Sequence, residues 1–542
     1  MFVNFLKRRS SLFVANTFIS MMLLLTVSSA IAQPGNLDTN FGGGLVTMCS
    51  GLGIAVTTQP NGKILVTGRA DNSDDDLVVV RYLPSGMRDA SFGLQGVATW
   101  DGGYDDLGRG IAVQPDGRIV VVGTTGNGLD DDMMVMRFNA DGSIDNSFGI
   151  AGVVIINASS LDEGHAVALQ PDGRIVAVGR SFTGGSNNFL IVRLNFDGTP
   201  DSSFNGIGVQ LWDNGGNLES ASGLALQPDG RMVVVGYSQS AGNDDLAVVR
   251  FNENGTLDNS FGNGGALLWD GMGEARGAGV ALQADGRIVV VGEREMSGNV
   301  DLLVLRLTGD GFLDTNFGIL GAAIWDGGGE DQGTDARVED NGRIVVSGFT
   351  NNGSDNDALL LGFDDTGDLD SGFATGGAFI WNGGNSDLFH GLSLQPEGKI
   401  LGVGGTFANA NWNLVLMRFH GGSALTGIIP NITVSSGNPF ILTGQLNTGS
   451  MSGQNADWWV GVNIASSPPD DWYHYDLTSG WMPGKTPTYQ GPLFDLSPYD
   501  ISGMSGLPVG TYTFYLAVDM DMNGLLDMDQ IYYDSVQVNI TQ

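Results

Sequence analysis

The chain has 542 residues, of which 60 are acidic and 24 are basic, so its formal net charge is -36. A surface this acidic repels nucleic acid and anionic lipid and attracts divalent cations, so we expect no nucleic-acid partner. The single cysteine, Cys49, cannot form an internal disulfide, so stability must come from packing or from bound metal.

Residues 1–32 have the pattern of a secretory signal peptide: the basic cluster Lys7–Arg9, the apolar run "MMLLLTV" and the small-residue ending "SSAIA". We expect cleavage after Ala32. The competing interpretation is a membrane anchor, which the shortness of the apolar run disfavours, and no later segment resembles a membrane span. The sequence therefore predicts a secreted protein, extracellular or at the cell surface, with the bacterial periplasm as the alternative destination.

Residues 33–425 contain seven copies of one unit. The segment "LQPDGRIVAVG" recurs with small changes at intervals of 55 to 57 residues, and the marker "LDxxFG" recurs in phase with it. Each unit contains four β-like runs separated by turn residues, and two of these runs are almost continuously apolar, as expected of strands covered on both faces. Four-stranded units of this length are typical of propeller blades. Because one blade cannot bury both of its faces, we predict an all-β, seven-bladed β-propeller.

The stretches "QPDGRIVVVG" and "RFNADGSIDNSFG" are similar to the repeats of the delta-60 repeat family over about residues 35–421. The resemblance implies a secreted bacterial β-propeller. It supplies no catalytic residues.

In five units a basic residue precedes the aspartate of "LDxxFG" by eight positions, as Arg137 precedes Asp145. The intervening residues partly match a calcium loop, but a guanidinium at the first position would occupy or repel the cation. We therefore predict an internal ion pair that holds the turn. The sixth unit has Gly362 in place of the arginine. Five units share a tryptophan, as at Trp100, for which we expect packing between blades in preference to sugar stacking.

Ligand sites are expected where the units differ, since a ligand usually breaks the symmetry of its ring. The departures include "EREM" at 293–296, "DARVED" at 335–340, and the pair His165 and His390, which share one blade position. Two histidines in non-adjacent blades could face each other across a central channel. The competing interpretation is a pair of exposed loop residues.

No catalytic motif is present: the chain has no G-x-S-x-G, H-E-x-x-H or P-loop pattern, so we expect no enzyme. The alternative stays open because a glycosidase or lyase needs only two or three well-placed carboxylates. Convergent carboxylates with a basic residue and stacked aromatic rings at the channel mouth would favour an enzyme. A polar mouth without them would favour a binding scaffold.

Residues 426–542 lack the repeat and alternate aromatic with polar residues, as in "WWVGVNI" and "YTFYLAV", which predicts a C-terminal β-sandwich. Within it, "DMDMNGLLD" has oxygen ligands at calcium-loop spacing, although the twelfth residue is Gln530 and not the usual glutamate. The predicted ligands, in a calcium-clamped hairpin, are Asp519, Asp521, Asn523, Leu525 (through its carbonyl) and Asp527.

These observations together predict a secreted, non-enzymatic binding or adhesion scaffold with calcium as its cofactor. Its partner is an extracellular ligand of unknown identity, either carbohydrate or protein. The alternatives are a carbohydrate-active hydrolase or lyase, and a purely structural component of an envelope or matrix.

Overall fold

The computed structural model describes residues 33–48, 50–71, 74–215, 218–240, 242–396 and 398–422, and beyond these the backbone of the strands between residues 432 and 541. The predicted signal peptide, residues 1–32, lies outside the described residues. Among the helices of the described part, none has the length and apolar character needed to cross a membrane.

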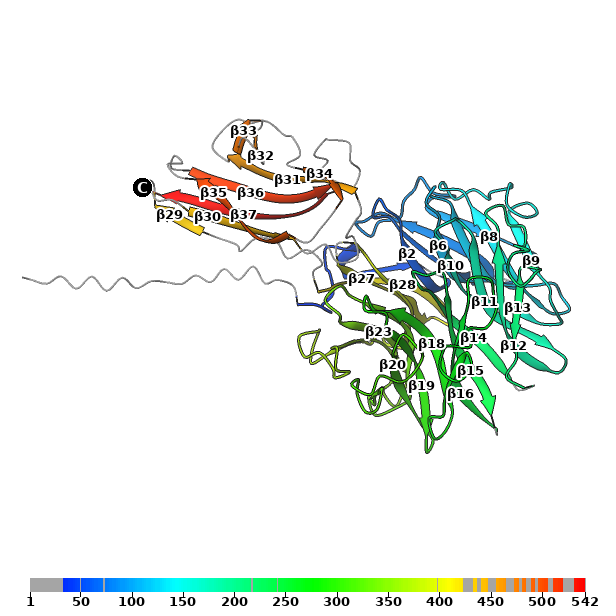
Figure 1. Ribbon diagram of the computed structural model, residues 1–542. Helices are drawn as coiled ribbons and strands as arrows, with labels where there is room; N and C mark the ends of the chain where they lie inside the picture. Colours follow the sequence, from blue (N-terminus) through cyan, green and yellow to red (C-terminus); the bar gives the residue numbers. More distant parts are fainter. Residues whose placement is uncertain are drawn as a thin grey trace, which may run out of the picture. The chain divides into compact units, whose positions relative to one another are not determined.

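Seven four-stranded antiparallel sheets form a ring, so the predicted β-propeller is confirmed (Figure 1). Blade one contains β2 (Leu52–Thr58), β3 (Ile64–Ala70), β4 (Asp76–Tyr82) and β5 (Val97–Trp100). Blade two contains β6 (Asp106–Val113), β7 (Ile119–Gly126), β8 (Asp131–Phe138) and β9 (Val153–Ile156). Blade three contains β10 (Asp162–Leu169), β11 (Ile175–Thr183), β12 (Ser186–Leu194) and β13 (Val209–Trp212).

The next three blades follow the same order. Blade four contains β14 (Glu219–Leu226), β15 (Met232–Ser240), β16 (Asn243–Phe251) and β17 (Ala266–Trp269). Blade five contains β18 (Ala275–Leu282), β19 (Ile288–Met296), β20 (Asn299–Leu307) and β21 (Ala322–Trp325). Blade six contains β22 (Asp331–Val338), β23 (Ile344–Asn351), β24 (Asn356–Phe363) and β25 (Ala378–Trp381).

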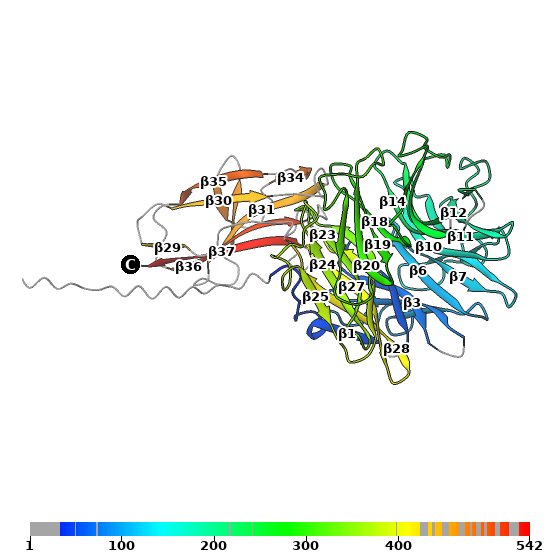
Figure 2. The same ribbon diagram turned by 90° about the horizontal axis from the view of Figure 1, so that it is seen from below.

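Blade seven is built from both ends of the propeller. Its inner strands are β26 (Asp387–Leu394), β27 (Lys399–Ala408) and β28 (Asn411–His420), and its outermost strand is the first of the chain, β1 (Leu45–Met48). Leu45 pairs with Met417 and Met48 with Leu414, and Figure 2 shows the blue β1 beside the yellow β28. The ring therefore closes through a shared blade, which pairs the edge that β28 would otherwise expose.

The core lies between blades, as the continuously apolar runs predict. Val233 and Val235 of blade four pack in one cluster with Ile288 and Val290 of blade five, and all four side chains are fully buried. Trp269, on the outermost strand of blade four, packs against the same cluster. The predicted packing role of the repeated tryptophans is therefore confirmed for the blades of the ring.

Each innermost strand contains a β-bulge at the same position, and the bulge needs a glycine on the neighbouring strand. A Cβ atom at Gly123 would lie only 1.8 Å from the carbonyl oxygen of Leu107, so the last residue of "RIVVVG" must be glycine for the strands to approach. The register shift singles out one residue in each blade: Ile54, Arg109, His165, Ser222, Ala278, Thr334 and His390.

The C-terminal strands form two sheets. Their bounds are β29 (Ile432–Ser435), β30 (Phe440–Leu446), β31 (Asn455–Ile464), β32 (Trp472–Asp476), β33 (Gly480–Pro483), β34 (Tyr489–Pro492), β35 (Leu496–Met504), β36 (Gly510–Asp519) and β37 (Ile531–Thr541). One sheet has the order β29-β37-β36-β31-β32-β33, with β34 also paired to β31, and the other pairs β30 with β35. The region is therefore all-β, and the predicted β-sandwich stays a prediction because its side chains lie outside the described residues.

Candidate functional site

The innermost strands of all seven blades surround a cavity of about 460 Å³, and all seven bulge residues line it. This volume falls within the range of small-molecule sites. Apart from small and aliphatic residues, the lining consists of Arg109, His165, Ser222, Thr334, Asp335, Arg337 and His390. We call this cavity the central channel.

His165 and His390 lie in strands β10 and β26 and both line the central channel, as one of the two sequence interpretations predicts. Each side chain is half-buried, so the alternative of exposed loop residues is wrong. Burial and repulsion by Arg109 lower the pKa of His390 to about 4. His390 is therefore a neutral imidazole near pH 7, with one donor and one acceptor nitrogen.

His165 is held by oxygen acceptors on both sides of its ring. Its Nδ1 lies 2.6 Å from the carbonyl oxygen of Ala221 in the next blade, and its Nε2 lies 3.1 Å from Glu163 Oε2. Glu163 also accepts a hydrogen bond of 2.7 Å from Arg180. Although burial alone would raise the pKa of Glu163, hydrogen bonds from His165 and Arg180 and the charge of Arg109 hold it at about 2.

Arg109 is the cation on the channel wall with the fewest partners. Its ion pair among the described residues is a 3.9 Å contact with Glu163, and its buried Nε has no hydrogen-bond partner there. Burial lowers the pKa of Arg109, with repulsion from Arg180 opposing the attraction of Glu163, yet an arginine keeps its charge in proteins. A half-buried guanidinium on the channel wall, with one distant carboxylate partner, favours an anion in the cavity.

The segment "DARVED" supplies the one carboxylate of the described channel lining, Asp335. Its Oδ2 accepts a 2.9 Å hydrogen bond from the backbone N–H of Leu392 in blade seven, and its Oδ1 accepts one of 2.6 Å from Arg337. Asp335 therefore ties blade six to blade seven. The equivalent position in the other blades holds only glycine or alanine: Ala55, Gly110, Ala166, Gly223, Gly279 and Gly391.

At the other ends of the strands, the predicted ion pair is present in six blades. Arg137 is fully buried, its Nε donates to Asp145 Oδ2 at 2.7 Å, and its guanidinium lies 4.5 Å from the ring centre of Phe148. It also donates to the carbonyl oxygen of Phe196 in the next blade. Each arginine thus joins two blades, and the pairs are Arg81–Asp89, Arg137–Asp145, Arg193–Asp201, Arg250–Asp258, Arg306–Asp314 and Arg418–Asp38.

Two of these positions differ in an informative way. Arg418 and Asp38 come from opposite ends of the propeller, so their 3.0 Å contact spans the shared blade. In blade six, where Gly362 replaces the arginine, Arg343 donates to Asp370 at 2.7 Å. Sequence reasoning missed this replacement. Arg343 ends the turn "NGR", the blade-six form of the repeated "DGR", and the equivalent Arg118 of blade two lies 3.4 Å from Asp145.

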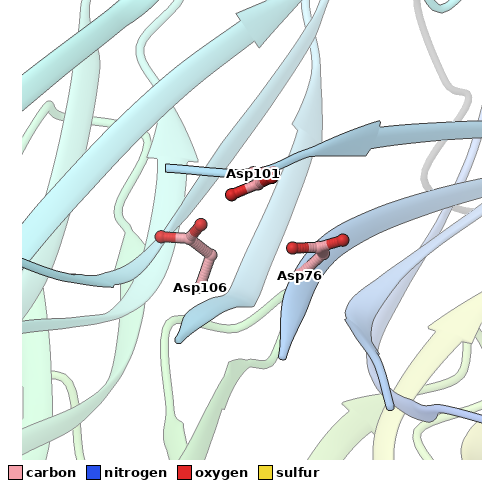
Figure 3. A group of neighbouring side chains, drawn as sticks. All are labelled: Asp76, Asp101 and Asp106. Carbon is pink, nitrogen blue, oxygen red and sulfur yellow. The ribbon is translucent and has the colours of Figure 1, made fainter. Parts of the chain in front are cut away.

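Two groups of carboxylates could hold a metal ion. Asp76, Asp101 and Asp106 meet between blades one and two (Figure 3), and a second group occupies the same positions between blades five and six: Asp301, Asp326 and Asp331. Neither group was predicted from the sequence. Of the predicted calcium ligands, Asp519 ends β36, and Asp521, Asn523, Leu525 and Asp527 lie outside the described residues.

Several solved structures resemble the chain, with 10–14% sequence identity. Sqt1 from Chaetomium thermophilum has a TM-score of 0.39 at 14% identity, with 71% of this chain and 100% of that chain covered. The Nup133 β-propeller domain of Vanderwaltozyma polyspora has a TM-score of 0.37 at 11% identity, covering 69% and 97%. A polysaccharide lyase, an ulvan lyase, has a TM-score of 0.27 at 10% identity, covering 85% and 94%.

No curated protein matches the sequence. Five segments match the model of one protein family, described as a domain of unknown function (DUF5122) beta-propeller: residues 59–92, 114–148, 170–204, 227–261 and 283–317. Each segment runs from the "QPDGR" turn to the "LDxxFG" marker, which are the parts that carry the interblade ion pairs. These five segments are therefore similar to the repeats described by this β-propeller model.

Proposed function

We propose that this protein is a secreted, non-catalytic binding module whose central channel accepts an acidic group of an extracellular ligand. The observation that carries the proposal is Arg109, whose side chain is 33% exposed on the channel wall and whose ion pair among the described residues is a distant 3.9 Å contact with Glu163. Carboxylate and sulfate groups match the planar donor arrangement of arginine.

The rest of the lining suits recognition of a polar ligand. Neutral His390 offers one donor and one acceptor, and Ser222 and Thr334 add hydroxyl groups from other blades. Gly110 and Gly223 let the innermost strands of adjacent blades approach closely, because a Cβ would lie 3.1 Å from Val167 N and from Ala278 O, respectively. The ligand chemistry we propose is therefore an acidic saccharide or another small organic anion.

The contrast with an enzyme rests on the carboxylates. Asp335, the one carboxylate of the described channel lining, is held by Leu392 N–H and Arg337 and so has no free oxygen directed to a substrate. The described lining also includes no Phe, Tyr or Trp on which a sugar ring could stack. A polar channel lining without convergent carboxylates or aromatic rings supports a binding scaffold over an enzyme.

A lyase acting on acidic polysaccharide is the second candidate, and one observation favours it. The unprotonated imidazole of His390 lines the same cavity as the Arg109 guanidinium, where its pKa of about 4 makes it a weak base. A lyase needs a base to remove a proton beside a carboxylate and a cation to stabilise the charge that develops there.

The proposal has two further parts. Membership of the delta-60 repeat family and export through the signal peptide at residues 1–32 would place the protein outside the cytoplasm. Residues 426–542 would form a C-terminal β-sandwich that mediates adhesion. Calcium would stabilise it through Asp519, Asp521, Asn523, Leu525 and Asp527.

The test is a glycan array that contains neutral, uronic-acid and sulfated glycans, probed with the parent protein and with Arg109→Gln. We expect the parent to retain acidic glycans and Arg109→Gln to lose them. Arg231→Gln, at an arginine 40% exposed in a turn of blade four, is the matched control and should bind like the parent.

Mass spectrometry of the glycans after incubation separates the alternatives. Unchanged glycans support the binding module, whereas cleaved or unsaturated products would establish the lyase. Retention that does not depend on Arg109 would reject the channel as the site, and the absence of retention on every glycan would favour a structural role.

A further inference from the structure

Three carboxylates meet where blade one packs against blade two. Asp76 begins β4, Asp101 directly follows β5, and Asp106 begins β6, so two come from one blade and the third from its neighbour. One oxygen of each lies within 4.8 Å of the other two, and Figure 3 shows the three groups gathered around one space. We call this group the junction triad.

Asp106 is the member that points to a ligand. Its side chain is fully buried, and its Oδ2 accepts a 2.5 Å hydrogen bond from the N–H of Gly102. Its Oδ1 is also buried and has no hydrogen-bond partner of good geometry among the described residues, as is also true of the equivalent Asp331 Oδ1. The hydroxyl of Thr125, the residue paired with Asp106 on β7, partly stabilises the carboxylate. Burial of a carboxylate oxygen without a partner is strongly unfavourable unless a cation compensates it.

The electrostatics of Asp106 agree with this geometry. Burial raises its pKa, and the charges of Asp101 and Asp76 raise it further, while the nearby Thr125 hydroxyl and Gly102 N–H offset part of the effect. Carboxylates that repel one another in a buried place are stabilised together when a divalent cation binds between them.

The spacing and the ligand type select the cation. One oxygen of each carboxylate lies within 4.8 Å of the other two, so all three can reach a single ion between them. Calcium binds oxygen at about 2.4 Å and so fits between carboxylates at this separation. Carboxylate oxygens favour such hard cations over zinc or copper. We propose that a calcium ion binds to Asp76, Asp101 and Asp106 and joins blade one to blade two, a role distinct from ligand binding in the central channel.

The second carboxylate group shows why the first is the stronger site. Arg294 lies 3.3 Å from Asp301 and pairs with it across β19 and β20, so a guanidinium already supplies positive charge between blades five and six. In blade one, Ala70 pairs with Asp76 at the same position and brings no charge. The strand pairing thus places a guanidinium beside the second group, whereas at the corresponding position of the junction triad the paired residue is uncharged.

The junction triad can be tested by titration with terbium, which replaces calcium and emits when a nearby tryptophan is excited. Trp100 precedes Asp101, and its ring and Asp106 Oδ1 both lie within 3.0 Å of the place that a Cβ of Gly102 would occupy. The experiment uses the full chain with Asp519→Ala and Asp521→Ala, so that the predicted C-terminal loop does not contribute.

We expect tryptophan-sensitised terbium emission that calcium displaces. Asp106→Asn should lower calcium affinity by about tenfold or more, because the number of charged ligands sets the affinity. Ala70→Arg should have the same effect without removing a carboxylate, since it places a guanidinium where blade five has Arg294. Ala70→Gln, of similar length but uncharged, is the matched control and should bind like the parent.

Circular dichroism checks that each variant is folded. If Asp106→Asn does not fold, the comparison of Ala70→Arg with Ala70→Gln tests the site instead. Absence of emission from the parent chain would overturn the proposal. Calcium affinity that is unchanged in both Asp106→Asn and Ala70→Arg would also overturn it, because the ion would then lie elsewhere.

Discussion

Replacing Arg137 by alanine tests the role of the interblade arginines. Arg137 is 1% exposed and donates to Asp145 at 2.7 Å and to the carbonyl oxygen of Phe196 in the next blade. Its guanidinium lies between two rings, 4.5 Å from the centre of Phe148 and 4.8 Å from that of Phe196. The substitution therefore removes an ion pair, an interblade hydrogen bond and two cation–π contacts.

The magnitude follows from what is left behind. Breaking a buried ion pair by removing one partner costs about 3 to 5 kcal/mol. Here Asp145 keeps hydrogen bonds from Ser147 and a second cation, Arg118, at 3.4 Å, which places the cost at the lower end. We expect Arg137→Ala to reduce the free energy of unfolding by about 3 kcal/mol.

Urea unfolding followed by tryptophan fluorescence measures this change, with Arg231→Ala as the control. Arg231 is 40% exposed and 3.7 Å from Asp258, so its removal should cost no more than about 1 kcal/mol. Equal effects of the two substitutions would refute the reasoning. A gain of calcium-dependent stability in Arg137→Ala would show that the turn is a calcium loop and not an ion-pair site.

Further outcomes follow from closure, burial and the C-terminal loop. Removal of residues 33–48 should expose the edge of β28, lower the melting temperature and promote association. Deletion of residues 202–257 should abolish cooperative melting. Unchanged calorimetric melting of either variant would contradict the closure of the propeller ring. Burial and the charge of Asp213 raise the pKa of buried Glu219 to about 7. Above pH 4.5 the unfolded chain releases this proton while the folded protein keeps it. The free energy of unfolding therefore falls as the pH rises from 4.5 to 7. Glu219→Gln should therefore stabilise the protein at pH 8 by on the order of 1 to 3 kcal/mol and have little effect near pH 4.5, and an equal effect at both pH values in unfolding titrations would be inconsistent with this assignment. In a variant that lacks the carboxylates of the junction triad, calcium should still raise the melting temperature, and Asp519→Ala with Asp521→Ala should remove that rise. A melting temperature that changes with neither calcium nor chelator would contradict the proposed C-terminal calcium loop.

The repeat made much of the propeller predictable from the sequence. Two markers in phase give the number of blades, and the eight-residue spacing of Arg137 and Asp145 gives their ion pair because both flank one turn. The position of the repeats also indicates how the ring closes. The segment "LVTM" at 45–48 stands where later units have their outermost strand, and no equivalent strand follows β28 among the described residues of the propeller.

The channel and the junction triad depend on contacts that one sequence does not reveal. Arg109 is a single cation at a variable position, and only the bulge of β6 brings it to the channel. Asp76 and Asp106 are 30 residues apart and meet only because adjacent blades pack face to face. The repeat makes such a site hard to recognise in the sequence. Aspartates at the positions of Asp76, Asp101 and Asp106 also occur between other blades where the group of three is not complete.

The most direct test of the proposed function is a crystal of the protein soaked in selenate, which has the charge of sulfate and scatters anomalously. We expect an anomalous peak in the central channel within hydrogen-bonding distance of the Arg109 guanidinium, and its loss in Arg109→Gln. A channel without a peak in the parent protein, or a peak that persists in Arg109→Gln, would contradict the proposal that this channel binds acidic groups through Arg109.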